Sequence, residues 1–354
     1  MLEIDPATAR ELARFGFDAE LLATLAERCA KRESTTITGA IAPLEPGDAS
    51  PLPPPGTPDH DRLSTLGRLA IARGEVGVVI LAGGMATRFG GVVKAAVSVV
   101  ANRSFLAVKV ADARLAGGVP IFVMTSAATH DRIVEQIASE HLDPIECFPQ
   151  HASLRLTPTG ELFLHAGKPE PYATGHGDLT FALRASGVLA RFRAAGGKVL
   201  YMSNVDNVAA TLDPVVIGAH LASGAAITAE VVRKEPGDRG GAPARVNDRA
   251  QIVEAFRFPN DFDQDRLALF NTNTFAFDAA AIDRDFELTY FRVEKSVDDA
   301  KVIQFERLVG ELTAFLPSHF LEVPRSRFLP VKDPEELDAR RADIEALLRA
   351  RGLL

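Results

Sequence analysis

Short apolar runs alternate with helical patterns from residue 66 onward, and this alternation restricts the fold more than any other feature of the sequence. Buried strands are predicted at 76–81, 120–125, 198–203 and 226–232. Helices are predicted around them at 104–115, 129–140, 178–194 and 213–222. Strands and helices in this order are typical of a mostly parallel sheet that is covered on both faces. The sequence therefore predicts an α/β fold.

The segments on either side of this pattern have a different composition and spacing of apolar residues. Residues 1–32 show helical apolar spacing, and the proline-dense stretch "LEPGDASPLPPPGTPDH" excludes both a helix and a central strand, so we expect an extended surface crossing there. After Glu235, glycine-rich turns predict a smaller antiparallel lobe with strands at 241–246, 251–256, 269–277 and 287–294. Helices are predicted near 301–314 and 334–351.

We expect three parts in the chain. Residues 1–60 would hold the N-terminal helices and the proline-rich crossing segment. Residues 61–330 would form a catalytic domain, with the lobe at about 235–295, and residues 331–354 a short C-terminal segment and helix. Of the 354 residues, 47% are apolar, which is enough for a sizeable core.

Charge and cysteine content exclude several classes of protein. The formal net charge of −8 argues against general nucleic-acid binding, which depends on basic surface. Cys29 and Cys147 form no CxxC motif, so neither a disulfide framework nor a zinc site is predicted. The N-terminus does not resemble a signal peptide, and no apolar run approaches the roughly 20 residues of a membrane-spanning helix. We expect a soluble, cytoplasmic protein with no membrane or nucleic-acid partner.

A glycine pair directly follows the first predicted strand, in "VGVVILAGGMATRFGGVVKAAV". Ligands of open α/β sheets bind beyond the carboxyl ends of the strands. Gly83 and Gly84 would let the backbone approach a phosphate or a base edge, and Thr87, Arg88 and Lys94 add a hydroxyl group and two cations. Neither the dinucleotide pattern GxGxxG nor the Walker A pattern matches. From the loop alone, a plain strand-to-helix turn with solvent-facing cations stays an alternative.

Further motifs follow this loop in a fixed order. They are "PYATGHGDLTFAL", "YMSNVDNV", "RGGAPARVNDRAQIVEAF", "LFNTNTFAFD", "KVIQFERLVGELTAF" and "VPRSRFLPVKDPEEL". Each is a weak signal alone. Together with "LAGGMATRFGGVVKA" they span about residues 76–340, and the chain resembles the UTP–sugar-1-phosphate uridylyltransferases, the family of eukaryotic-type UDP-glucose and UDP-N-acetylglucosamine pyrophosphorylases.

The resemblance implies a fold and a reaction. The fold is a Rossmann-like nucleotide-diphosphosugar transferase fold, with a central mixed sheet, helices on both faces and a smaller sugar-binding lobe. The reaction is magnesium-dependent: glucose 1-phosphate attacks the α-phosphorus of UTP in line, which gives UDP-glucose and pyrophosphate. The segments "RFLPVK" and "VIQFE" look closer to the glucose enzymes, with N-acetylglucosamine 1-phosphate or galactose 1-phosphate as alternative substrates.

The resemblance also bears on oligomeric state. The chain stops soon after "RFLPVK", whereas many eukaryotic members continue into a C-terminal β-helix. We therefore expect no β-helix, no oligomerisation through such a module, and a monomer or weak dimer.

Four charged residues match the family at the phosphates. Arg88 would grip the β- and γ-phosphates, Lys94 would lie at the α-phosphate, and Lys332 would bring a second lysine from the far end of the chain. Asp206 would be the magnesium ligand, because Mg²⁺ prefers hard oxygen ligands. On the residues alone, Asp206 fits a cap or turn equally well, and Lys332 fits a solvated surface lysine.

Other matched residues would bind the base, the ribose and the sugar. The nucleotide-binding set is Leu81, Ala82, Gly83, Gly84, Thr87, Gln150, Gly175 and His176. The Gln150 amide offers uracil a donor and an acceptor. A sugar phosphate dianion needs no general base, so His176 is assigned to binding. Gly241, Glu254 and Asn273 would bind the sugar, with ordinary hairpin chemistry as the alternative, and Asp178 and Asn207 are interpreted as caps.

The chain departs from the family pattern beside Lys94. The family usually has glycine at the position of Ala86, and Pro-Lys-Gly where this chain has Val93, Lys94 and Ala95. If position 86 needs a positive φ, alanine costs about 1 kcal/mol. Val93 lacks the ring that would fix the backbone. A nucleotide-binding regulatory protein with weakened turnover is therefore an alternative, although the retention of all four charged residues argues against it.

Overall fold

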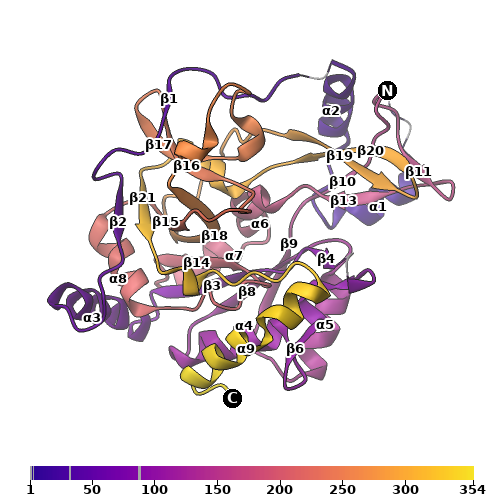
Figure 1. The fold of residues 1–354 in the computed structure, drawn as a ribbon. Coiled ribbons are helices and arrows are strands. Elements are labelled where there is room, and N and C mark those ends of the chain that lie inside the picture. Colours follow the sequence, from indigo (N-terminus) through magenta and orange to yellow (C-terminus); the bar gives the residue numbers. More distant parts are fainter. Residues whose placement is uncertain (1, 3, 32, 87–88) are drawn as a thin grey trace.

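An eight-stranded mixed sheet forms the centre of the molecule (Figure 1). The computed structural model describes residues 2, 4–31, 33–86 and 89–354. The strand order is β2 (Ala49–Pro51), β21 (Ser318–Glu322), β15 (Ile227–Arg233), β18 (Leu269–Asp278), β14 (Val199–Asn204), β3 (Val76–Leu81), β8 (Ile121–Thr125) and β9 (Glu146–Pro149). Strand β18 runs antiparallel to β14 and β15, and the other neighbouring pairs of this sheet are parallel.

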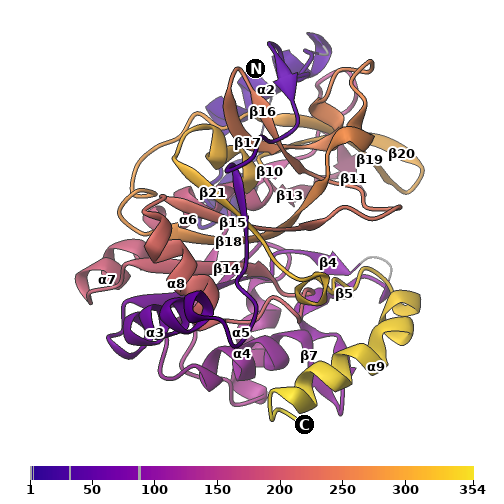
Figure 2. The same cartoon turned by 60° about the vertical axis from the view of Figure 1, so that its left-hand side comes forward.

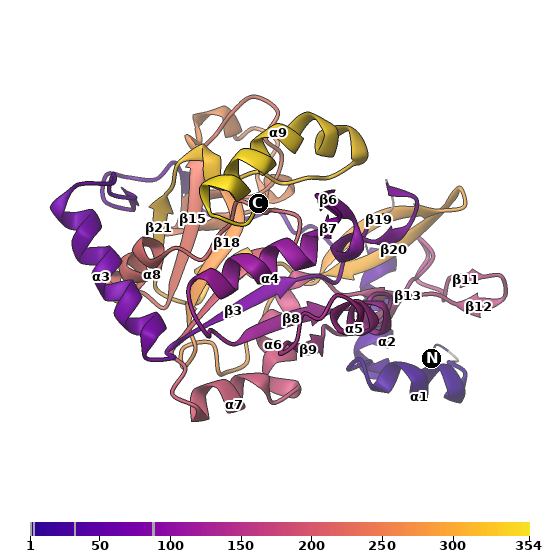
Figure 3. The same cartoon turned by 90° about the horizontal axis from the view of Figure 1, so that it is seen from below.

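Side chains of β3 supply two separate cores, because successive residues of a strand point to opposite faces. Val76, Val78 and Ile80 belong to one core, and Val79 and Leu81 belong to the other. The first core is covered by α3 (Pro58–Ala72), α4 (Phe105–Leu115), α5 (His130–Ser139), α8 (Pro214–Ser223) and α9 (Pro334–Ala350). The second is covered by α6 (Leu179–Ala185) and α7 (Val188–Ala194). Figure 3 shows α4 and α7 on opposite sides of β3 and β8. The predicted α/β architecture is confirmed.

Three of these helices begin at a capping residue followed by proline. Thr57, Asp213 and Asp333 accept hydrogen bonds from backbone N–H groups of the first turns of α3, α8 and α9. The next residue is proline in each case, and its missing N–H costs nothing at that position. The sequence therefore sets these helix starts locally.

Smaller elements surround the central sheet. A three-stranded sheet contains β1 (Ile41–Ala42), β16 (Ala242–Val246) and β17 (Arg249–Val253). Antiparallel pairs are formed by β19 (Phe291–Val297) with β20 (Ala300–Glu306), β10 (Ala152–Leu154) with β13 (Pro171–Ala173), β4 (Met85–Ala86) with β5 (Val92–Val93), β6 (Ser98–Val100) with β7 (Arg103–Ser104), and β11 (Leu164–His165) with β12 (Lys168–Pro169).

The N-terminal helices α1 (Pro6–Ala13) and α2 (Ala19–Lys31) pack onto two of these strand pairs. Their apolar side chains share a core with residues of β10 and β20, including Leu154 and Phe305. Figure 2 shows this end of the molecule opposite α9 and the C-terminus. The helices of the described part of the chain include none with both the length and the apolar character needed to span a bilayer.

Three local predictions are corrected. The segment 301–314 is no helix: it forms β20 and a 3₁₀ helix over Val309–Ala314, because residues 300–306 pair with β19. The segment 178–194 holds two helices, since Gly187 takes a left-handed conformation with φ of 74° between them. The strand predicted at 269–277 is β18 of the central sheet and lies outside the smaller lobe. The division of the chain near residues 60 and 330 stays a prediction.

Candidate functional site

The carboxyl ends of four parallel strands meet at one edge of the central sheet. Register places Leu81 beside Asn204 and Met124, and Thr125 beside Pro149. A cavity of about 370 Å³ opens at this edge. It is lined by Leu81, Gly83, Gly84, Met85, Lys94, Met124, Gln150, Ala173, Gly175, His176, Asn204, Val205, Asp206 and Glu306. Eight of the predicted site residues thus line one cavity: Leu81, Gly83, Gly84, Lys94, Gln150, Gly175, His176 and Asp206. Their roles stay predictions.

Gly83 and Gln150 are packed against each other in the cavity wall. A Cβ atom at Gly83 would lie 2.0 Å from Gln150 Nε2, whereas a Cβ at Gly84 would meet open space. Close packing therefore requires glycine at position 83. The Gln150 side chain is buried, and its Oε1 atom accepts no hydrogen bond from the described residues. An unsatisfied buried acceptor is costly, so this oxygen is suited to receive a donor from a ligand.

Gly175 and His176 form another part of the wall. Gly175 has φ of 92°, and a Cβ there would lie 2.5 Å from the carbonyl oxygen of Arg307. His176 Nδ1 accepts the backbone N–H of Val309 at 3.1 Å, so the ring proton lies on Nε2. Burial lowers the pKa of His176 to about 4. The ring is therefore neutral at pH 7 and can donate a hydrogen bond from Nε2.

Lys94 and Asp206 form an ion pair in the cavity wall. Lys94 begins the 3₁₀ helix Lys94–Ala96, and its backbone N–H donates to the carbonyl of Gly84 at 3.3 Å. Asp206 follows the end of β14. The predicted phosphate-binding cation and the predicted metal ligand are therefore direct neighbours.

The backbone is unstrained at Ala86 and Val93, two of the positions where the chain departs from the family pattern. Ala86 belongs to β4 and pairs with Val92, so its backbone is extended, and the cost expected for a positive φ does not arise. Val93 has φ of −66°, a value that a proline ring would also impose. Thr87 and Arg88 lie outside the described residues.

The segment that carries Lys332 is docked beside Asp206. The backbone N–H of Val331 donates to the carbonyl of Asp206 at 3.2 Å. Asn207 Oδ1 accepts the N–H of Leu329 at 2.9 Å, so Asn207 tethers this segment and is not the cap that its sequence context predicts. The Lys332 side chain is exposed and does not line the cavity.

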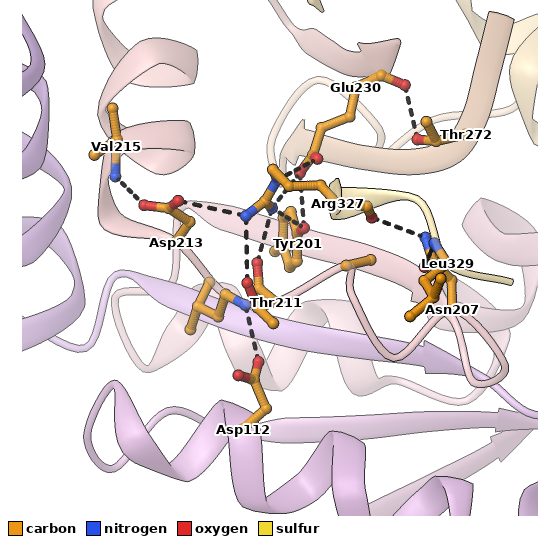
Figure 4. A network of polar contacts seen from close by, with 12 residues as sticks. Asp112, Tyr201, Asn207, Thr211, Asp213, Val215, Glu230, Thr272, Arg327 and Leu329 are labelled. Carbon is orange, nitrogen blue, oxygen red and sulfur yellow. Dashed lines mark hydrogen bonds and ion pairs between the residues drawn. The ribbon is translucent and has the colours of Figure 1, made fainter. Parts of the chain in front are cut away.

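Arg327, whose side chain is 10% exposed, anchors the same segment (Figure 4). Arg327 donates from Nε and Nη2 to the Glu230 carboxylate at 2.8 and 2.9 Å, and from Nη2 to the Tyr201 hydroxyl at 3.0 Å. It also donates to Thr211 and Asp213. Sequence reasoning missed this network. The only signal was the arginine of "RFLPVK", which gives no hint of its partners.

The predicted sugar-binding residues lie outside the cavity lining, and one of them, Asn273, contacts a cavity residue. A Cβ at Gly241 would lie 2.8 Å from Glu254 Oε1, so these two residues are in contact. Asn273 has φ of 56° at an irregularity of β18, and its Nδ2 donates to Oδ1 of the cavity residue Asn204 at 3.0 Å. Burial raises the pKa of Glu254 to about 7.

Asp178 occupies the N-cap position of α6, as predicted, but its side chain does not act as the cap. Its carboxylate makes no capping hydrogen bond to α6. It accepts the backbone N–H of His151 at 3.1 Å and pairs with Arg307.

A magnesium ion would fit this site only together with substrate oxygens. The described residues contain no group of three or more His, Cys, Asp or Glu side chains that could hold a metal ion. Asp206 offers one carboxylate at the cavity wall. Because Mg²⁺ is commonly bound by one or two carboxylates plus substrate phosphates, this donor set suits the ion once a nucleotide is present.

Comparison of the sequence with known families gives a match over most of the chain. The family model described as UTP–glucose-1-phosphate uridylyltransferase matches residues 45–347. The enzyme of that name from Musa acuminata is 32% identical over 249 residues, which cover 65% of this chain and 53% of the relative. The one from Solanum tuberosum is 31% identical over 255 residues, which cover 67% and 53%. The chain spans about half the length of the curated relatives it matches.

Solved structures share the fold. A UDP-glucose phosphorylase from Trypanosoma brucei superimposes with a TM-score of 0.76 at 23% identity, covering 94% of this chain and 77% of that one. A mutant of UDP-glucose pyrophosphorylase from Leishmania major in complex with UDP-glucose gives 0.73 at 23% identity, covering 95% and 79%. The central sheet and its flanking helices are therefore those of this structural class.

Proposed function

The chain belongs to the UTP–glucose-1-phosphate uridylyltransferase family, and we propose on this basis that it transfers the uridylyl group of UTP to glucose 1-phosphate, giving UDP-glucose and pyrophosphate. One observation carries the proposal. The cavity at the carboxyl edge of the sheet combines an unpaired buried amide oxygen on Gln150 with the Lys94–Asp206 pair. A base-binding wall and a phosphate-binding wall would thus face one cavity.

Uracil would bind against Gln150 and the glycine loop. The free Oε1 of Gln150 would accept the N3–H group of the base, and its amide nitrogen would donate to the neighbouring carbonyl oxygen. Leu81, Ala82, Gly83 and Gly84 would lie along the base and the ribose. The neutral ring of His176 would donate from Nε2, and Gly175 would leave room for the nucleotide.

The reaction is a single displacement at phosphorus. An oxygen of glucose 1-phosphate attacks the α-phosphorus while the bond to the bridging oxygen of pyrophosphate breaks, and that oxygen keeps the electron pair. Lys94 would leave Asp206 and neutralise the α-phosphate, while Arg88 and Lys332 would hold the departing pyrophosphate. Magnesium, bound by Asp206 and phosphate oxygens, would supply further charge neutralisation. Positioning and electrostatics thus provide the catalysis.

The sugar would lie toward the smaller lobe. Asn273 is joined to the cavity residue Asn204 by a hydrogen bond, and Gly241 and Glu254 would complete the sugar site. An amide and a carboxyl group are suited to bind hydroxyl groups. N-acetylglucosamine 1-phosphate and galactose 1-phosphate are the alternative acceptors.

Pyrophosphate release from UTP and glucose 1-phosphate with Mg²⁺ tests the proposal. We expect release by the wild type, loss of release in Lys94→Ala, and normal release in the control Lys168→Ala, whose exposed lysine lies on β12 away from the cavity. The two other sugar phosphates serve as competing substrates. A rise in Tm with UTP and no release with any sugar phosphate would instead indicate a nucleotide-binding protein without turnover.

A further inference from the structure

A buried ion pair lies directly behind the wall that carries Gln150 and His176. It joins Asp178, whose side chain is 0% exposed, to Arg307, whose side chain is 7% exposed. Neither residue lines the cavity. We propose that the pair is a positioning device for the base-binding wall, and that it sets the preference for uracil over cytosine. This inference rests on the proposed uridylyl transfer.

Asp178 fixes the backbone next to Gln150. Its carboxylate accepts the N–H of His151 at 3.1 Å and the hydroxyl of Thr174. The N–H of Gln150 itself donates to the carbonyl of Thr125 at 2.9 Å. Gln150 is therefore held between strand β8 on one side and the Asp178 carboxylate on the other.

Arg307 fixes the segment that contains Gly175 and His176. Its backbone N–H donates to the carbonyl of Thr174 at 2.8 Å, and its carbonyl accepts the N–H of Gly177 at 2.9 Å. Its guanidinium group lies over two rings, 4.1 Å from the centroid of Phe181 and 4.7 Å from that of Tyr290. The planar guanidinium group thus contacts two aromatic rings and the Asp178 carboxylate.

Both walls of the base pocket therefore depend on one ion pair. The Asp178 side chain determines the position of the His151 backbone, and the Arg307 main chain determines that of Gly177. The Arg307 Nη2 atom also lies 3.4 Å from His151 Nδ1, which links the two walls directly. A change in the pair would move Gln150 relative to His176.

Base selection requires this accuracy because a side-chain amide can match two pyrimidines. Uracil presents the N3–H donor beside the O4 acceptor, whereas cytosine presents the N3 acceptor beside an amino donor. An amide turned by half a turn matches cytosine as well as it matched uracil. Discrimination therefore depends on an amide that is held in one orientation, and a loosened wall would lose selectivity as well as affinity.

Stability alone gives a poor reason for such a pair. Apolar residues of similar volume often stabilise a core as well as a buried ion pair does, because removing two charges from water is expensive. A positioning role explains why the pair lies at this place in the core.

Two conservative variants test the role. Asp178→Asn keeps an acceptor for His151 but removes the charge, and Arg307→Lys keeps the charge but removes the planar group. We expect each to lower kcat/KM for UTP and the ratio of kcat/KM values for UTP over CTP by about tenfold, since small displacements in a site are costly. The KM for glucose 1-phosphate should stay the same. The control Asp48→Asn disrupts a partly buried pair with Arg245 that does not border the cavity, so it should change Tm and leave the UTP/CTP ratio unaltered.

The double variant Asp178→Leu/Arg307→Met covers the case in which a single variant unfolds. Near-native Tm with a lowered UTP/CTP ratio would support positioning. A wild-type ratio in the folded double variant, or in either single variant, would overturn it. If the wild type releases no pyrophosphate, the proposed reaction fails, but the rise in Tm with UTP compared with CTP still measures selectivity in every variant. Equal Tm shifts for both nucleotides in the wild type would then overturn the inference as well.

Discussion

The side-chain amine of Lys94 is paired with the carboxylate of Asp206 in the wall of the cavity. Their side chains are 17% and 16% exposed, so both are partly withdrawn from water. Lys94 follows strand β5 and Asp206 follows strand β14, and the parallel pairing of β14 with β3 brings the two loops together. Removal of either residue leaves the other charge without its partner.

Asp206→Asn tests the carboxylate as a metal ligand. We expect pyrophosphate release to fall by about 100-fold, the size of effect typical for one electrostatic group in an active site. Mg²⁺ should also enhance the UTP-induced rise in Tm less than in the wild type, because a neutral amide binds the ion more weakly. The matched control is Asp338→Asn on α9, whose side chain is 77% exposed. Unchanged pyrophosphate release and an unchanged Mg²⁺ response would show that Asp206 is not a metal ligand.

Gly83→Ala tests the packing of the glycine loop against Gln150. The added Cβ would lie 2.0 Å from Gln150 Nε2, so the amide must move. We expect the Kd for UTP, measured by calorimetry, to rise by about tenfold or more, since a buried polar contact is lost. Gly118→Ala is the control, because its Cβ would meet open space away from the cavity. Equal UTP affinity in both variants would mean that Gln150 does not bind the base.

Glu254→Gln tests the buried carboxyl group through the pH dependence of stability. Burial raises the pKa of Glu254 from its ordinary 4.5 to about 7 in the folded protein. A raised pKa means that the folded state holds the proton more tightly, so the free energy of unfolding should fall as pH rises from about 4.5 to about 7. The fall should be at most roughly 3 kcal/mol.

Urea unfolding at several values between pH 5 and pH 8 measures this effect. In Glu254→Gln the decrease should be smaller by the contribution of this one group. Glu135→Gln on α5, whose side chain is 68% exposed, should keep the wild-type dependence. Identical curves for the wild type and Glu254→Gln would show that the carboxyl group is not buried in this way.

Arg327→Met tests the anchor of the C-terminal segment. It would leave the buried Glu230 carboxylate without its cation, and the free energy of unfolding should fall by about 3–5 kcal/mol. Arg349→Met, which removes an exposed pair with Glu345 on α9, should cost about 0.5 kcal/mol or less. Chemical unfolding of the three proteins at one pH gives the comparison. A small loss in Arg327→Met would contradict the anchoring role.

Sequence patterns predicted the strands of the central sheet well because buried parallel strands appear as continuous apolar runs. The predicted strands 76–81 and 198–203 differ by at most one residue at either end from β3 and β14. The helix predicted at 301–314 was wrong because the short apolar run "VIQF" fits the spacing of a helix as well as that of a strand. Pairing with β19 makes this segment a strand.

The candidate site was predictable where its residues follow strand ends. Gly83, Gln150 and Asp206 fall into this class, and the cavity brings all three together. The partners of buried charges could not be predicted in the same way. Asp178 pairs with Arg307 and Glu230 with Arg327, and in each case the partner comes from a distant part of the chain whose position only the folded structure sets.

The docking of residues 325–332 beside Asp206 has a consequence for protein synthesis. Arg327 and Lys332 are translated after the glycine loop, Gln150 and His176. Until then Glu230 lacks its cation and Asn207 lacks the N–H of Leu329. A nascent chain that has not yet reached Arg327 therefore contains the glycine loop, Gln150 and His176 but lacks the segment that docks beside Asp206.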